Sequence, residues 1–574
     1  MKYLRINMSD LSYREETVPH DRLLLGGRAL TSQILLDEVP PTCHPLGPHN
    51  KVIIANGVLT GSLASSAERT SIGAKSPLTG GTKESNAGGT AGLKMGRLGY
   101  RAIIIEGIRD DYQVVVIDKN GVRFEPADEL LGLRVSQSAQ ILMNKYGTQV
   151  GISLIGVSGE MRMNTAAVTN LDKDGSPTRF YGRGGLGAVW GSKGVKAIIL
   201  DDSDIERNKP MDRERFMDGM KNYAQALREN PATSKLYPEL GTSAMVRTTN
   251  RLGALPTRNF STGSFEQHEN ISGETMREMI LERGGEGSTT HACMPGCAIR
   301  CSNIFPDEQG KKVTTPIEYE NIGLLGSNLG IGNLDQVVEL NLLCNELCVD
   351  TIEIGAAIGV AMQAGIASFG DFEAAKNMLL ALEKGEPLGR IIGGGAVMVG
   401  KIYGERRVPA VKGQGMPAYE PRGIKGLGVT FATSPQGADH TAGMTIRAQV
   451  DHRSPEGQVK LSYDAQHISV IVDSLGICYM ASGAIFGKDN FRHIVNLVSG
   501  YIGQEITEED IRAMARKCLR DEHLFNKAAG FTKADDRLPE YMYLEENPAA
   551  GTKFDVKDEE LDEIGVTSVS DHDR

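Results

Sequence analysis

The chain of 574 residues lacks three features that would each indicate a different class of protein. It has no run of about 18 apolar residues, so no segment is predicted to cross a membrane. It has no surplus of basic charge: 62 Lys and Arg stand against 73 Asp and Glu, and the net charge of −11 argues against a nucleic-acid partner. The N-terminal sequence MKYLRINMSD lacks the continuous apolar stretch of a signal peptide, so we expect a cytoplasmic protein.

Regularly spaced cysteines are also missing. The eight cysteines are unevenly distributed, and without a secretion signal we expect reduced thiols rather than disulfides. Glycine, by contrast, is abundant at 68 of 574 residues, against a usual share of roughly 7%. The glycines stand beside Arg, Asn and apolar residues, which indicates tight turns where the backbone approaches a neighbour closely.

A chain of this length is predicted to form roughly three domains. Apolar runs favour strands at 51–54, 101–106, 113–118, 150–157 and 195–200. From about Asp212 the apolar spacing favours helices, at 213–228, 333–350, 352–367, 372–384 and 507–520. A third region, rich in Pro and Gly, begins near Pro409. We expect a surface turn at Asn303–Thr315 and a loose acidic tail from about Asp555.

Three cysteines lie within nine residues, at Cys293, Cys297 and Cys301. On an unbroken helix they would span about 12 Å, too far for the corners of one cubane. Pro295-Gly296 is predicted to break such a helix and let the thiols converge. A [4Fe–4S] cluster needs four thiolates, and the distant Cys478 is the candidate for the fourth.

Two other interpretations of these cysteines stay open. Zinc also binds four thiolates, but structural zinc sites are typically two C-x₂₋₄-C pairs, which a triplet and a remote cysteine fit less well. Buried thiols with no ligand role are the other possibility. Cys344 and Cys348 lie four residues apart on a predicted helix, and we interpret them as core thiols.

Three stretches rich in glycine and arginine are predicted to hold a phosphorylated ligand, because glycine lets backbone N–H groups face an anion and arginine binds phosphate. They are Gly26–Leu30, the stretch from Ser66 through Arg69 and 75–81 to Gly89, and Arg179–Gly187. The last also contains G-x-G-x-x-G at Gly182, Gly184 and Gly187. Nicotinamide binding is not favoured, because we expect neither the strand before nor the helix after that such a site needs.

Together these residues resemble the aldehyde:ferredoxin oxidoreductase family of tungsten, sometimes molybdenum, enzymes. The resemblance runs in family order from Gly26 to Cys478. It implies an α+β protein with a β-rich pterin-cradling domain over 1–208 and two mainly helical domains over 209–415 and 416–574. It further implies a tungsten or molybdenum ion held by two pterins, and a [4Fe–4S] cluster at Cys293, Cys297, Cys301 and Cys478.

The resemblance assigns cofactor-binding positions residue by residue. Those implied to bind pterin are Arg69, Asn86, Gly88, Arg179, Phe180, Gly182, Arg183, Asn345, Asp350, Asp473 and Ile477. Backbone carbonyls of Asn86 and Phe180 would also hold an Mg²⁺ ion that bridges the pterin phosphates. Two departures stand out: the family's Asp-x-x-Gly-x-Asp is Asn345-Glu-Leu-Cys348-Val-Asp350, and its C-x₂-C-x₃-C is C-x₃-C-x₃-C here.

Two further segments match family segments near the metal, one with Glu318 and Glu320 and one with His440. A glutamate in an apolar pocket has a raised pKa and can act as general base toward water. Glu318 is the first choice of base and Glu320 the second, and on a strand both would share a face. His440 would donate a hydrogen bond that stabilises developing negative charge.

The resemblance implies oxidation of a small-molecule aldehyde to a carboxylic acid, with electrons passed to ferredoxin or a small iron–sulfur subunit. A homodimer is one possible assembly. Three alternatives stay open. The first is the same scaffold acting on a hydroxy acid or an aromatic acyl thioester, and the second is a non-catalytic electron-transfer subunit. A zinc-stapled binding protein is the third.

Overall fold

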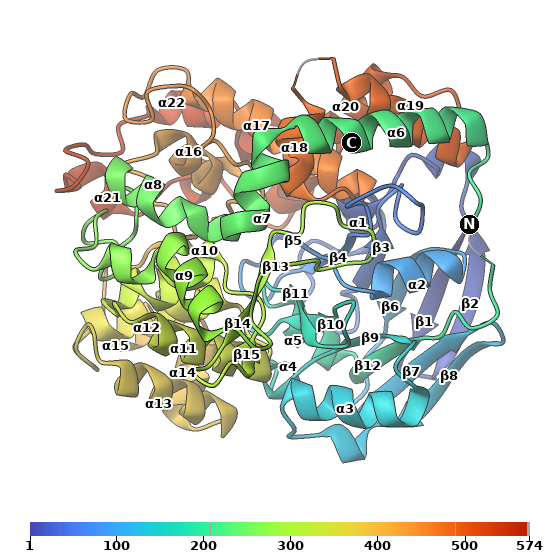
Figure 1. Ribbon diagram of the computed structural model, residues 1–574, viewed down its shortest axis with the longest axis horizontal. Helices are drawn as coiled ribbons and strands as arrows, with labels where there is room; N and C mark the ends of the chain where they lie inside the picture. The colour runs from blue at the N-terminus through green and yellow to red at the C-terminus, as the bar shows by residue number, and fades with distance from the viewer. Residues whose placement is uncertain (207, 488, 571–574) are drawn as a thin grey trace.

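A strand-rich N-terminal part and a mainly helical remainder make up the protein (Figure 1). The computed structural model describes residues 1–206, 208–487 and 489–570. The strand-rich part contains two six-stranded sheets, which confirms the predicted α+β fold. No helix of the described residues is long and apolar enough to span a membrane.

The two sheets have the same connectivity. The first has the order β2-β1-β6-β3-β4-β5 and contains β1 (Lys2–Asn7), β2 (Ser12–Thr17), β3 (Val52–Asn56), β4 (Thr70–Lys75), β5 (Thr82–Ala87) and β6 (Tyr100–Glu106). The second has the order β8-β7-β12-β9-β10-β11 and contains β7 (Gln113–Asp118), β8 (Gly121–Pro126), β9 (Gly151–Leu154), β10 (Val168–Leu171), β11 (Pro177–Tyr181) and β12 (Val195–Leu200). In each sheet the pair β1–β6 or β7–β12 is parallel and the others are antiparallel.

This duplication has a short sequence signal that we did not predict. The pattern Gly-x-x-Gly-x-(Arg/Lys)-Ala-Ile-Ile occurs at 96–104 and again at 191–199. In both copies the second glycine, Gly99 or Gly194, has a positive φ at the turn into the last strand of its sheet. The copies place β5 and β11 in equivalent positions, at the open edges of their sheets.

Apolar strand faces explain how the sheets pack. One face of each sheet contributes to a shared core around Trp190, with the short helices α2 (Ala91–Arg97) and α5 (Leu186–Ser192) between them. The outer face of the first sheet packs against α1 (Gly27–Glu38), and that of the second against α3 (Val135–Tyr146). Strands such as β6 and β12 are therefore buried on both faces, which is why they read as continuous apolar runs.

The helical remainder has two cores. The first is built mainly from α8 (Met245–Leu252), α9 (Gly273–Arg283), α10 (Tyr319–Leu325), α11 (Leu334–Leu347), α12 (Thr351–Gln363), α13 (Phe372–Glu383), α14 (Pro387–Gly393), α15 (Ala396–Tyr403), α16 (Lys425–Thr433) and α21 (Glu540–Leu544). The second is built mainly from α6 (Arg213–Glu229), α7 (Tyr237–Leu240), α17 (Gln458–Leu475), α18 (Ser482–Ile485), α19 (Phe491–Ile502) and α20 (Glu508–Ala528). Helices α6 and α19 lie side by side along one edge of the molecule (Figure 1).

Two local predictions were wrong. Residues Asn303–Thr315 are mostly a hairpin of β14 (Ser302–Pro306) and β15 (Lys312–Thr314), which pairs with β13 (Ser288–His291); only the residues between the strands form a turn. The segment after Asp555 is packed and not loose, because α22 (Asp558–Asp562) buries Leu561 and the following turn buries Val566. Residues 571–574 of the predicted tail lie outside the described residues.

Candidate active site

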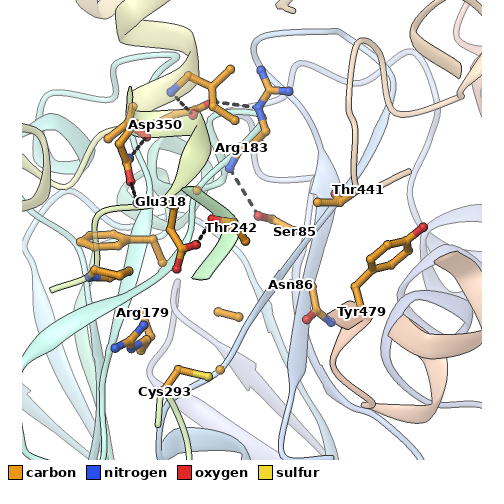
Figure 2. Close-up of a pocket in the computed structure, with 18 of the residues that line it drawn as sticks. Ser85, Asn86, Arg179, Arg183, Thr242, Cys293, Glu318, Asp350, Thr441 and Tyr479 are labelled. Carbon is orange, nitrogen blue, oxygen red and sulfur yellow. Dashed lines mark hydrogen bonds and ion pairs between the residues drawn. The ribbon is translucent and has the colours of Figure 1, made fainter. Parts of the chain in front are cut away.

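A cavity of about 370 Å³ lies where the edge strands β5 and β11 meet the first turns of α10 and α12 (Figure 2). Fifteen of the predicted site residues line it: Arg69, Asn86, Gly88, Arg179, Phe180, Gly182, Arg183, Cys293, Cys301, Glu318, Asn345, Asp350, His440, Asp473 and Cys478. Three predicted residues do not line it, namely Cys297, Glu320 and Ile477. The Ile477 side chain is instead buried in an apolar core.

The first glycine–arginine stretch packs the protein and does not reach the cavity. A Cβ on Gly27 would lie 2.0 Å from the Asp473 carbonyl oxygen, so glycine is needed for α1 to approach α17. The Arg28 guanidinium is buried and donates two hydrogen bonds to Glu522, of 2.9 and 2.8 Å. The predicted anion-binding role of this stretch is therefore wrong, because neighbouring residues fill the space around Gly27 and Arg28. The prediction failed because close packing and anion binding favour the same residue types.

The other two stretches do reach the cavity. Arg69 donates to the Asn86 side-chain oxygen and, at 2.9 Å, to the Asn86 carbonyl. Arg183 donates to Asp350 Oδ2 at 3.2 Å and to the carbonyls of Ala438 and Gly415, each at 2.6 Å. Both guanidinium groups thus tie separate segments of the wall together.

The G-x-G-x-x-G segment differs from our expectation, because β11 precedes it and the short α5 follows it. A Cβ on Gly182 would meet no atom within 4 Å, so the backbone there faces open space. Arg179 donates to Ser302 Oγ at 3.0 Å and lies 3.1 Å from His291 Nδ1. Its Nε is buried and has no hydrogen-bond partner among the described residues.

The cysteine segment is not helical around Pro295-Gly296, as predicted, and Cys293 and Cys301 line the same cavity as Cys478. Ser65 Oγ donates to the Gly296 carbonyl at 2.9 Å, and Ser66 Oγ lies 3.5 Å from Cys297 Sγ. The Ser66 carbonyl also accepts a hydrogen bond of 2.8 Å from the backbone N–H of Cys478. This serine pair therefore joins the triplet to the remote cysteine.

The electrostatics of the thiols differ. A hydrogen bond from Cys293 lowers the pKa of the Cys297 thiol to about 5, whereas burial raises the pKa of Cys301 and of Cys478. Within the described residues no three Cys, His, Asp or Glu side chains are arranged around a single metal ion. Cys344 and Cys348 are fully buried, which confirms them as core thiols.

Glu318 lies at the N-terminus of α10 and not on a strand, so it does not share a strand face with Glu320 as we expected. Its backbone N–H donates to Asn321 Oδ1 at 2.7 Å, and its carboxylate accepts a hydrogen bond from the Thr242 hydroxyl. Figure 2 shows the Glu318 carboxylate beside Thr242 in the cavity. Burial raises the pKa of Glu318, and Thr242 and Arg179 oppose the rise.

Glu320 and His440 form a second pair, with Glu320 Oε1 3.5 Å from His440 Nε2. Burial raises the pKa of Glu320 to about 8 and lowers the pKa of His440 to about 4. Near neutral pH the contact is therefore a carboxylic acid beside a neutral imidazole and not an ion pair. Glu320 Oε2 accepts a hydrogen bond of 2.7 Å from the backbone N–H of Ala418.

Asp439 and Lys83 are site residues that we did not predict. Lys83 Nζ donates to Asp439 Oδ2 at 2.6 Å, and both side chains are buried. Burial opposes ionisation of Asp439, but Lys83 and Arg183 outweigh it and lower its pKa. Asp439 adjoins His440, which was predicted, whereas no sequence signal distinguishes Lys83 within its strand.

Asp473 and Asn345 line the cavity from two helices. Asp473 lies near the end of α17, and burial raises its pKa well above the usual range. Asn345 Nδ2 on α11 donates to Thr314 Oγ1 at 3.2 Å. Its amide therefore remains next to the cavity although the family's Asp is missing.

Comparison with known proteins gives one consistent result. The chain matches the models of the aldehyde ferredoxin oxidoreductase N-terminal domain over 3–202 and of domains 2 and 3 over 218–564. It is 31% identical to the tungsten-containing aldehyde ferredoxin oxidoreductase of Pyrococcus furiosus, over 96% of this chain and 93% of that protein. The Thermococcus kodakarensis enzyme of the same name is also 31% identical, over 95% of this chain and 91% of that protein.

More distant similarities extend the comparison. The aliphatic sulfonate oxidoreductase WOR-like subunit of Pyrococcus furiosus is 26% identical over 88% of this chain and 82% of that protein. The solved active-site complex BamBC of benzoyl coenzyme A reductase, bound to 1,5-dienoyl-CoA, has the same fold, with a TM-score of 0.80. The similarity covers 98% of this chain and 93% of that chain at 17% sequence identity. The protein is an oxidoreductase enzyme. It belongs to the aldehyde ferredoxin oxidoreductase family.

Proposed function

We propose that this protein is a tungsten-dependent enzyme that oxidises aldehydes to carboxylic acids and passes the electrons through a [4Fe–4S] cluster to ferredoxin or a small iron–sulfur subunit. Its relatives at 31% identity carry tungsten, aldehyde and ferredoxin in their names. The observation that carries the proposal is the lining of one cavity by three of the four predicted cluster thiols together with Glu318 and His440.

The residues present fit a pair of pterins. Two equivalent strand edges, Asn86–Gly88 and Phe180–Gly182, face the same cavity, as a pair of similar groups would need. The open space at Gly182 and the partnerless Nε of Arg179 suit a polar ligand. Asp473, Asn345 and Asp350 would contact the pterins from the opposite helices. The thiols of the cysteine segment and Cys478 are the donors that an iron–sulfur cluster requires.

A bridging Mg²⁺ would be held by the backbone carbonyls of Asn86 and Phe180. The Asn86 carbonyl already accepts a hydrogen bond from Arg69, and a carbonyl oxygen has a second lone pair for a cation. Mg²⁺ prefers oxygen ligands, including the phosphates it would bridge. The side chains of Arg69 and Asn86 would then position the carbonyl.

The overall reaction consumes one aldehyde and one water and releases one carboxylic acid, two protons and two electrons. The bound metal centre would supply the two-electron acceptor. Glu318 would take a proton from water at its carboxylate, and its raised pKa makes it a stronger base than an exposed glutamate. His440, held neutral by burial, would donate a hydrogen bond to the aldehyde oxygen.

Elemental analysis and an activity assay on anaerobically purified protein test the proposal. We expect about one tungsten and about four iron atoms per chain, and aldehyde-dependent reduction of a viologen dye. Molybdenum in place of tungsten would change the metal and leave the reaction. Zinc without tungsten, or reduction only with a hydroxy acid or an acyl thioester, would overturn the proposal.

A further inference from the structure

The cavity reaches the surface beside His440. Thr441, the next residue, lines the cavity and is exposed to solvent. The segment 441–457 then runs to the start of α17 without forming a helix or strand. This segment therefore leaves the mouth of the cavity at Thr441.

Arg447 is the charged side chain of this segment that lies at the rim. Its guanidinium carbon lies 4.9 Å from the ring centre of Tyr237, and its Nη2 lies 3.6 Å from the sulfur of Met480. Met480 lines the cavity, so Arg447 is one side chain away from the interior. Arg447 itself is exposed.

The Arg447 charge has no acidic partner within the part of the chain that the structure describes. Among the described residues no carboxylate lies within 4.0 Å of its guanidinium nitrogens, whereas most other arginines near the cavity are paired with acids or carbonyls. Its contacts are an aromatic face and a thioether, which hold the group in place and leave most of its N–H donors unused. An uncompensated, oriented guanidinium at a cavity mouth is suited to a carboxylate or another oxyanion.

Tyr419 lies near both Arg447 and His440. Burial raises the pKa of Tyr237 and Tyr419, and Arg447 opposes the rise in both, which places these two phenols within reach of its charge. The Tyr419 ring centre lies 5.9 Å from that of His440. Tyr237 and Tyr419 are buried behind the cavity lining, and Tyr479 lines the cavity itself, so an aromatic layer lies between Arg447 and His440.

We propose that Arg447 binds an anionic group, a carboxylate or a sulfonate, at the end of the substrate opposite the aldehyde carbon. The preferred substrates are then aldehydes that carry such a group, and Tyr479 and Met480, which line the cavity, would contact the chain between the two ends. This specificity rests on the proposed aldehyde oxidation. The competing interpretation is that Arg447 only fastens the segment 441–457 to Tyr237.

Steady-state kinetics of the holoenzyme distinguish these two roles. Carboxylate- and sulfonate-terminated aldehydes are each compared with the neutral aldehyde of the same length, and the two anions show which oxyanion is favoured. In Arg447→Gln we expect KM for the anionic aldehydes to rise about tenfold with kcat unchanged, since a charge-assisted hydrogen bond is lost. KM for the neutral aldehydes stays within about twofold, because they make no such bond.

Two further variants control the result. Arg447→Lys keeps the charge and is expected to restore part of the lost affinity. Arg492→Gln, on the exposed side of α19, changes the net charge equally and leaves both substrate classes unaffected. Equal losses for anionic and neutral aldehydes in Arg447→Gln would overturn the proposal and favour the fastening role.

Calorimetry with unreactive anions provides a readout without turnover. Glutarate and propanesulfonate are titrated into the wild-type holoenzyme and into Arg447→Gln, and at least one is expected to bind the wild type about tenfold more tightly. Equal binding, or none to either protein, rejects the anion site. If the wild type oxidises no aldehyde but binds these anions through Arg447, the proposed function fails and the anion site stands.

Discussion

Replacing Glu318 with Gln tests the assignment of the base most directly. The amide oxygen of Gln can still accept the hydrogen bond that the Thr242 hydroxyl donates to Glu318. The backbone bond from Glu318 to Asn321 Oδ1 is also kept. The substitution therefore leaves the local structure intact and removes only the ability to take a proton.

The expected loss in kcat is about 100- to 10,000-fold, the usual contribution of a positioned general base. This corresponds to roughly 3–5 kcal/mol on the barrier. Because Glu318 must be ionised to act, wild-type kcat/KM is expected to rise with pH through its raised pKa. That rising limb disappears in Glu318→Gln.

Glu320→Gln is the matched control. With a pKa of about 8, Glu320 is already neutral near pH 7, and its carboxyl does not line the cavity. Its replacement should lower kcat by less than about tenfold, since no positioned proton acceptor is lost. Tungsten and iron contents are measured in both variants by elemental analysis. Wild-type turnover in Glu318→Gln with full metal content would refute the assignment.

Three further outcomes follow from buried groups. Arg28→Met strands the buried Glu522 carboxylate and should lower the free energy of unfolding by about 3–5 kcal/mol in denaturant titrations; a change below about 1 kcal/mol contradicts this. Cys478→Ser should reduce iron to well below four atoms per chain with unchanged circular dichroism, and full iron would exclude Cys478 as a ligand. Because the pKa of Glu320 is raised from 4.5 to about 8, folded-state stability should fall as pH rises between these values. Glu320→Gln should reduce this pH-dependent loss of stability, measured by thermal melts at several pH values. The same dependence on pH in both proteins would contradict the raised pKa of Glu320.

The strands and long helices were predictable because burial leaves a regular pattern. The run 113–118 became β7 and the run 195–200 became β12 without a change of bounds, since both are covered on two faces. The hairpin at Ser302–Thr314 was missed because its strands are too short to show alternation. A strand as short as β15, which has three residues, is determined mainly by tertiary contacts.

Site residues were predictable where a motif places them and not where the fold does. Arg183 was predicted to face a ligand, yet its partners at 350, 415 and 438 are fixed only by tertiary structure. Gly27 and Arg28 have the composition of an anion-binding loop, but α17 and α20 occupy the space where an anion would sit. Residue type alone does not reveal what already fills the space around a side chain.

The duplicated sheets place the two candidate pterin segments in equivalent positions although their sequences differ. Asn86 pairs with the second residue of β4, and Phe180 pairs with the second residue of β10, so the two occupy equivalent positions. Their side chains, an amide and a phenyl ring, have no polar function in common. At this pair of positions only the backbone carbonyls can act alike in the two halves, which is consistent with the proposed role of these carbonyls as Mg²⁺ ligands.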